Sequence, residues 1–151
     1  MMLAYRLVRL IENHSEQLAN SLYFKIQNSD KTRDFRKVPP EEFRQRVGEI
    51  YHQLGEWLLG KTEADIEHYY VEMGRRRAVQ GVPLSQLIWA IALTKENLMQ
   101  FLNDESRGEE PAELFGELEL LQLLEQFFDR AVYYAAVGHE RELAFSARAT
   151  A

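Results

Sequence analysis

Four histidines are the residues of this chain best suited to metal or acid–base chemistry: His14, His52, His68 and His139. No two of them stand three or four positions apart, the spacing that would place both on one face of a helix. A di-iron bundle needs a pair of Glu-x-x-His motifs, and the sequence has no such pair. The chain also has no cysteine, which excludes thiolate catalysis and cysteine-ligated metal sites. The sequence therefore predicts no catalytic residue, no metal site and no cofactor.

Neighbouring carboxylates offer a second route to chemistry, since two carboxyl groups with different pKa values can act as acid and base. Glu41–Glu42 directly follow Pro39–Pro40, where they suit the positive N-terminal end of a helix. Glu109–Glu110 lie in a polar segment. Both pairs are typical of solvent-exposed side chains, so we predict that the protein is not an enzyme.

Cations are concentrated in Arg75-Arg76-Arg77, close to the expected end of a helix. The helix dipole favours a cation at that end, which would explain one arginine. Three in succession point in different directions, so at least one should face a neighbouring element, as an anion clamp or a partner contact. Lys95 follows Ile91 by one turn on the apolar side of a later helix. It either snorkels to solvent or pairs with a buried carboxylate or the acid group of a ligand.

Aromatic residues occur as adjacent pairs, Tyr69–Tyr70, Phe127–Phe128 and Tyr133–Tyr134. Neighbours on a helix point about 100° apart, so only one of each pair can face the core, and the other can contact a dimer partner. The leucines of segment 118–124 also span more than one helix face. We therefore predict a homodimer. Its predicted interface residues are Leu120, Leu123, Phe127 and Tyr134.

The spacing of the apolar residues is helical along the whole chain. Five main helices are expected, at about 3–26, 39–60, 62–80, 83–102 and 112–145. Residues 27–38 and 103–111 are predicted connections, and 145–151 a frayed tail. The sequence therefore predicts a single all-α domain over residues 1–151, globin-like or a helix bundle, with a long C-terminal helix.

Local signals mark three of the helix ends. Gly60 is expected to end the second helix in a left-handed conformation. Thr62 and Asp65 resemble a capping box at the start of the third helix. Gly81 and Pro83 separate the third helix from the fourth.

The composition limits the partners of this protein. The net charge is −6, a poor match to nucleic acid or an anionic membrane, which attract clustered cations. No apolar run approaches the roughly 18 residues of a membrane span, and the N-terminus lacks the pattern of a signal peptide. We expect a cytoplasmic protein that binds neither nucleic acid nor membrane.

Four segments together carry a family resemblance: Ile66-Glu67-His68-Tyr69-Tyr70, Gly74-Arg75-Arg76-Arg77-Ala78, Gly81-Val82-Pro83-Leu84-Ser85 and Ala90-Ile91-Ala92-Leu93-Thr94-Lys95. They resemble the N-terminal domain of RsbR-type proteins, the RsbT co-antagonists of stressosome signalling. The segment 127–134 is similar to the exit helix that leads into their output modules. The resemblance covers about residues 41–140. It implies a helical sensory and dimerisation domain, similar to a globin without haem.

The resemblance also bears on haem. In haem-bearing globin sensors a similar segment has a glycine three residues before the proximal histidine. Three residues after Gly74 this chain has Arg77, so we predict that no haem is bound through that position. Only His68 or His14 would remain as alternative iron ligands.

Two functional hypotheses follow. The first is a non-enzymatic regulatory module of bacterial signal transduction, which dimerises and relays a signal through its C-terminal helix. Related proteins carry an output domain after this helix, so the sequence is either part of a longer protein or acts by associating with a signalling partner.

The alternative is a sensor that binds a small apolar or acidic ligand in an apolar pocket between the third, fourth and fifth helices. The predicted ligand-binding residues are Tyr70, Met73, Arg77, Trp89, Lys95 and Phe128.

Overall fold

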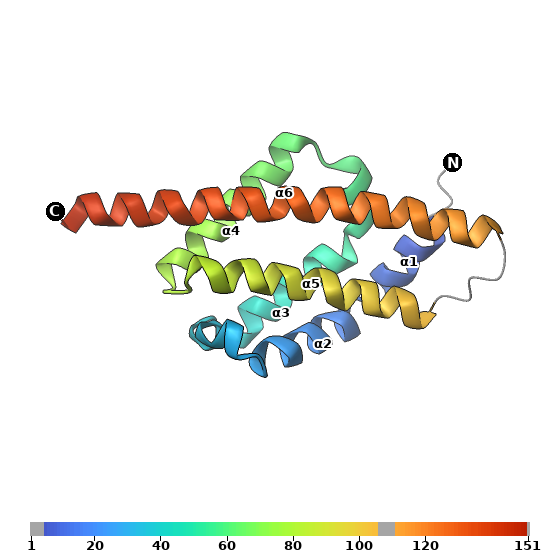
Figure 1. The fold of residues 1–151 in the computed structure, drawn as a ribbon, viewed down its shortest axis with the longest axis horizontal. Coiled ribbons are helices and arrows are strands. Elements are labelled where there is room, and N and C mark those ends of the chain that lie inside the picture. The colour runs from blue at the N-terminus through green and yellow to red at the C-terminus, as the bar shows by residue number, and fades with distance from the viewer. Residues whose placement is uncertain (1–4, 106–110, 151) are drawn as a thin grey trace.

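The computed structural model describes residues 5–105 and 111–150, and within these ranges the chain is helical with no strand. The elements are α1 (Tyr5–Asn13), α2 (Ser15–Gln27), the 3₁₀ segment η1 (Asp30–Lys37), α3 (Pro40–His52), the π-helical turn η2 (Glu56–Gly60), α4 (Glu63–Val79), α5 (Leu84–Glu105) and α6 (Pro111–Thr150) (Figure 1). The predicted all-α fold with a long C-terminal helix is confirmed. None of the described helices is long and apolar enough to span a membrane.

Two of the predicted helices are each divided in the structure. The first helix breaks at His14, which has φ −112° and ψ 21° and whose Nδ1 lies 2.8 Å from the carbonyl oxygen of Leu10. The second breaks at Gln53 and continues as the π-helical turn. That turn buries Trp57, whose ring lies 4.8 Å from the ring of Tyr69. Burial of an aromatic side chain therefore accompanies the irregular backbone.

The connection predicted at residues 27–38 is the 3₁₀ segment η1, and it is anchored to the core. Thr32 is buried and its hydroxyl donates to the carbonyl oxygen of Ile26 at 2.8 Å. Phe35 and Val38 are also buried. These contacts fix the polar segment against α2 and the core, and Asp34 is hydrogen-bonded to Gln86 of α5.

Both ends of α4 lie where the local sequence predicts them. The end of the preceding segment, at Gly60, does not have the predicted conformation. The Thr62 amide donates to Asp65 Oδ2 at 2.9 Å, and the Asp65 amide donates to Thr62 Oγ1 at 3.2 Å, which confirms the capping box. Gly81 has φ 82° and ends the helix. The left-handed cap predicted at Gly60 is wrong, because among the described residues only Gly81 has a positive φ. Gly60 instead ends the π-helical turn, which the Lys61 amide closes by donating to the backbone carbonyl oxygen of Glu56 at 2.7 Å.

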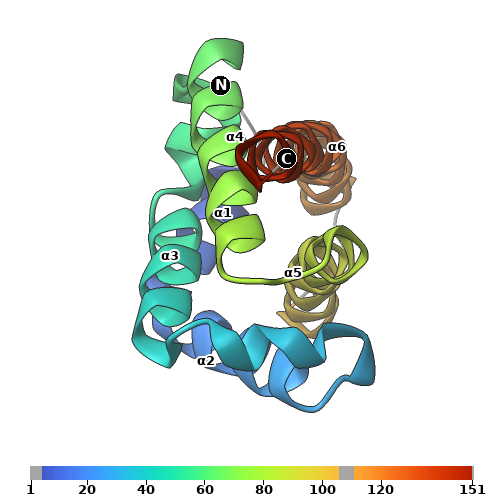
Figure 2. The same ribbon diagram turned by 90° about the vertical axis from the view of Figure 1, so that its left-hand side faces the viewer.

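The helix α6 runs along the length of the molecule, with α4 on one side of it and α5 on another (Figures 1 and 2). The contact between α4 and α6 is the most extensive one between described elements. Two glycines permit it. A Cβ at Gly74 would lie 2.8 Å from the carbonyl carbon of Ala135, and one at Gly138 would lie 2.7 Å from that of Val71. The backbones of α4 and α6 therefore touch directly at this crossing.

The C-terminal end of α6 projects beyond the other helices (Figure 1). The helix continues through Thr150, so the tail predicted to fray at 145–151 is helical over its described residues. Leu143 and Phe145 are exposed on it. Residues 3–4 of the first predicted helix, 106–110 of the predicted loop with Glu109–Glu110, and Ala151 lie outside the described residues.

Candidate functional site

A cavity of about 60 Å³ lies where α3, α4, α5 and α6 meet. Most of its lining is apolar, from side chains such as Phe43, Ile50, Leu87 and Ile91. Its lining residues with polar side-chain atoms are Arg46, Tyr69, Tyr70, Arg77 and Thr94. An apolar cavity with a few polar groups is the usual form of a small-ligand site, although typical sites of about 300–1,000 Å³ are much larger.

The structure brings four of the six predicted ligand-binding residues together at this cavity. Tyr70, Met73 and Arg77 contribute from α4, and Phe128 contributes from α6. The other two are on α5 and point elsewhere. The ring of Trp89 lies 4.1 Å below the ammonium group of Lys31, and Lys95 forms an ion pair with Glu125 at 2.7 Å.

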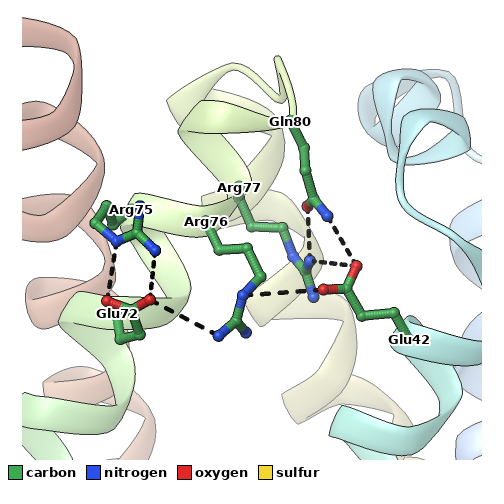
Figure 3. A network of polar contacts seen from close by, with 6 residues as sticks. All are labelled: Glu42, Glu72, Arg75, Arg76, Arg77 and Gln80. Carbon is green, nitrogen blue, oxygen red and sulfur yellow. Dashed lines mark hydrogen bonds and ion pairs between the residues drawn. The ribbon is translucent and has the colours of Figure 1, made fainter. Parts of the chain in front are cut away.

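The three consecutive arginines of α4 have three different environments (Figure 3). Arg75 donates to both carboxylate oxygens of Glu72, at 2.9 and 2.6 Å, on the exposed side of the helix. Arg76 lies between Glu72 and Glu42, with ion-pair distances of 3.8 and 3.9 Å. Arg77 points inward and is only 3% exposed. The expectation that one of the three faces a neighbouring element therefore applies to Arg76 and Arg77, which both face α3.

The Arg77 guanidinium is fixed along one edge. Its Nη1 donates to Gln80 Oε1 at 2.8 Å and lies 3.5 Å from Glu42 Oε2 (Figure 3). Gln80 in turn donates to the same Glu42 oxygen at 2.8 Å. Burial lowers the pKa of Arg77, and the Glu42 carboxylate opposes that effect. Arginine remains charged in proteins all the same, so the cavity has a permanent cation in its wall.

Tyr69 and Arg46 also contribute polar groups to the cavity wall. The Tyr69 hydroxyl is buried and makes no hydrogen bond within the described part of the chain. Burial raises the pKa of Tyr69, and the nearby Arg46 guanidinium lowers it in part, although no hydrogen bond of good geometry joins the two side chains. Sequence analysis did not predict Arg46 as a cavity residue. Its position between Phe43 and Ile50, on the apolar face of α3, was the available signal.

The predicted dimer-interface residues have mixed environments. Leu120 and Phe127 are buried in the core of this chain, at 0% and 3% exposed. Leu123 is half-buried, and so is Tyr134, whose hydroxyl donates to Glu63 at 2.8 Å. Other large apolar side chains of α6 are exposed. Among the described residues they are Leu114, Phe115, Leu118, Leu121, Tyr133, Leu143 and Phe145.

The histidines occupy separate places. The ring of His14 lies 5.4 Å from that of Phe101. His139 on α6 is buried, its Nε2 donates to the carbonyl oxygen of Val82 at 2.6 Å, and its Nδ1 has no partner among the described residues. His68 is exposed. No group of three or more metal-ligating side chains was found within residues 5–105 and 111–150.

These features define an all-helical domain with a small, arginine-bearing cavity whose wall includes a long C-terminal helix. Residues 16–151 match the family described as the RsbT co-antagonist protein rsbRD N-terminal domain. The match covers most of the chain, so the chain belongs to this family of regulatory signalling domains. Comparison with curated proteins found no match, and neither did comparison with solved structures.

Proposed function

We propose that this protein is a non-enzymatic regulatory module of stressosome type, which acts in the cytoplasm and relays a signal through α6. The observation that carries the proposal is the continuity of α6. This helix of 40 residues contributes Phe128 to the cavity wall, touches the backbone of α4 at Gly138, and continues beyond the other helices. A rigid helix that contacts both the interior and a projecting end is suited to passing a displacement to a partner or an output domain.

Dimerisation is part of this proposal. Leu114, Phe115, Leu118 and Leu121 are exposed on one half of α6. Contiguous exposed apolar side chains on a soluble domain are characteristic of an interaction surface. A second copy of the chain could bury this surface. The predicted interface residues Leu123 and Tyr134 lie on the other flank of α6, beside Glu63, and would not belong to it.

The oligomeric state tests the proposed interface. Sedimentation velocity of the whole chain at micromolar concentration is expected to give a dimer, and Leu118→Glu is expected to give a monomer, because a carboxylate would be placed in the buried interface. Phe24→Glu is the matched control, since Phe24 is 68% exposed on α2 and lies outside the proposed interface. A monomeric wild-type chain, or equal loss of dimer in both variants, would contradict the interface.

A sensor function is the second candidate, favoured by the cavity that collects Tyr70, Met73, Arg77 and Phe128. A ligand there would contact both α4 and α6. Native mass spectrometry of gently purified protein tests this function, since a carried ligand adds a mass that disappears on denaturation. If the protein carries no added mass and binds no small molecule in the cavity, the sensor function is excluded and only the proposed relay through α6 remains.

A further inference from the structure

We infer that the cavity between α3, α4, α5 and α6 is a binding site for a short-chain monocarboxylate of acetate size. The carboxylate would be held by Arg46, Arg77 and the Tyr69 hydroxyl, and its methyl group would face the apolar wall. This inference rests on the sensor function proposed above and adds the chemical class of the ligand.

The charge around the cavity favours an anion. The charged side chains that line the cavity are those of Arg46 and Arg77. The carboxylates near them, Glu42 beside Arg77 and Glu49 near Tyr69, do not line it. An anion in the cavity would therefore contact guanidinium groups in a largely apolar environment, where it would be stabilised more strongly than in water.

The hydrogen-bond donors around the cavity are incompletely used. Nη1 of Arg77 makes the contacts with Gln80 and Glu42. The buried Tyr69 hydroxyl lies near Arg46 but makes no hydrogen bond of good geometry within the described part of the chain. A buried donor without an acceptor costs stability, and a carboxylate has two oxygens that accept from such donors. The site lacks acceptors, and a carboxylate supplies them.

The volume and lining select the size and the apolar end of the ligand. A dry apolar cavity of about 150 Å³ holds benzene, which has six heavy atoms, so about 60 Å³ corresponds to roughly two to three heavy atoms. Acetate has four and therefore sets the upper limit of ligand size. The wall formed by Leu87, Ala90 and Ile91 would receive its methyl group, which an inorganic anion lacks.

Binding can be measured on the whole chain by NMR titration of its backbone amides with sodium acetate at constant ionic strength. We expect saturable shifts near Tyr69, Met73 and Phe128, with a Kd in about the millimolar range because so small a ligand gains little energy. Arg46→Gln should weaken binding about tenfold or more, since it removes a charged hydrogen-bond donor. Tyr69→Phe should weaken it several-fold. Arg44→Gln is the matched control, because Arg44 is on the same helix, pairs with Glu41 and does not line the cavity.

Two further comparisons make the result decisive. Acetamide, the neutral isostere, should bind much more weakly than acetate. Ala90→Val, which adds two carbons to the cavity wall, should abolish binding while circular dichroism shows the helical fold retained. Acetamide binding as tightly as acetate would overturn the carboxylate assignment and leave a sensor of another ligand class. Nitrate binding as tightly as acetate would overturn the role of the methyl group. No saturable binding of acetate, or equal loss in Arg44→Gln and Arg46→Gln, would overturn the site itself.

Discussion

The direct contact of α4 with α6 predicts an unusual response to glycine-to-alanine substitution. Alanine in place of glycine normally stabilises a helix by about 1 kcal/mol. At Gly74, however, the new Cβ would lie 2.8 Å from the carbonyl carbon of Ala135, and at Gly138 it would lie 2.7 Å from that of Val71. Ordinary carbon–carbon contacts are about 3.5–4.0 Å, so the helices must separate by roughly 1 Å to relieve this contact, and the carbonyl oxygens of Ala135 and Val71 lie nearer still to the added Cβ.

The magnitude follows from which atoms collide. Overpacking a core costs about 1–3 kcal/mol when side chains can adjust, and occasionally more. Here backbone atoms collide and no rotamer change relieves them, so the cost should be at the upper end or above it. After the gain in helix propensity, we expect Gly74→Ala or Gly138→Ala to lower the free energy of unfolding by about 2 kcal/mol. For a chain of this size that lowers Tm by about 4–8 °C.

Gly48→Ala is the matched control. Gly48 lies inside α3, and a Cβ there would have no heavy atom within 4 Å. This substitution should therefore raise the free energy of unfolding by about 0.5–1 kcal/mol. Urea denaturation of the three variants measures all of these effects. If Gly74→Ala proved as stable as Gly48→Ala, the backbone contact between α4 and α6 would be refuted.

Three other predictions concern single side chains. Burial raises the pKa of Tyr51 and Tyr70 above the ordinary value of 10.0, so the folded chain holds these protons when the unfolded chain releases them. The stability they contribute is complete below pH 10 and falls as pH rises above it. Urea denaturation across this range should show the free energy of unfolding falling, and Tyr51→Phe should make that fall smaller. Thr62→Ala should lower the free energy of unfolding by about 1 kcal/mol through loss of the capping box, and an unchanged urea midpoint would count against the cap. Glu42→Gln should cost about 1–3 kcal/mol by thermal denaturation, because it leaves the buried Arg77 without its carboxylate; a variant as stable as the wild type would show that the pair contributes nothing.

The features predicted correctly from the sequence are those set by nearby residues. The start of α3 at Pro40, the capping box of Thr62 and the end of α4 at Gly81 each depend on fewer than five consecutive residues. The breaks at His14 and Gln53 were missed because neither position has a glycine or proline to mark it.

Long-range contacts decided the parts of the site that the sequence left open. Arg77 lines the cavity, but its partner Glu42 comes from another helix, and nothing in the local pattern connects the two. Lys95 pairs with Glu125 of α6 at the surface, so its apparent place on an apolar face was misleading. Leu120 and Phe127 illustrate the same limit. Both are buried inside their own chain, whereas Leu118 and Leu121 of the same apolar segment are exposed, and helical spacing alone does not tell these two groups apart.

The geometry of α4 leads to a final prediction about the relay. Arg77 and Gly74 are less than one turn apart on this helix, so the cavity wall and the contact with α6 belong to one rigid segment. Side-chain contacts could absorb a small displacement of α4, whereas touching backbones transmit it. We therefore expect acetate to change hydrogen exchange in residues 140–150, which project beyond the other helices, as well as near the cavity. Exchange measured by mass spectrometry with acetate and with acetamide would separate binding from a general solvent effect. If amides near Met73 and Phe128 responded to acetate while 140–150 did not, the ligand would be bound without being relayed, and signalling through α6 would need another input.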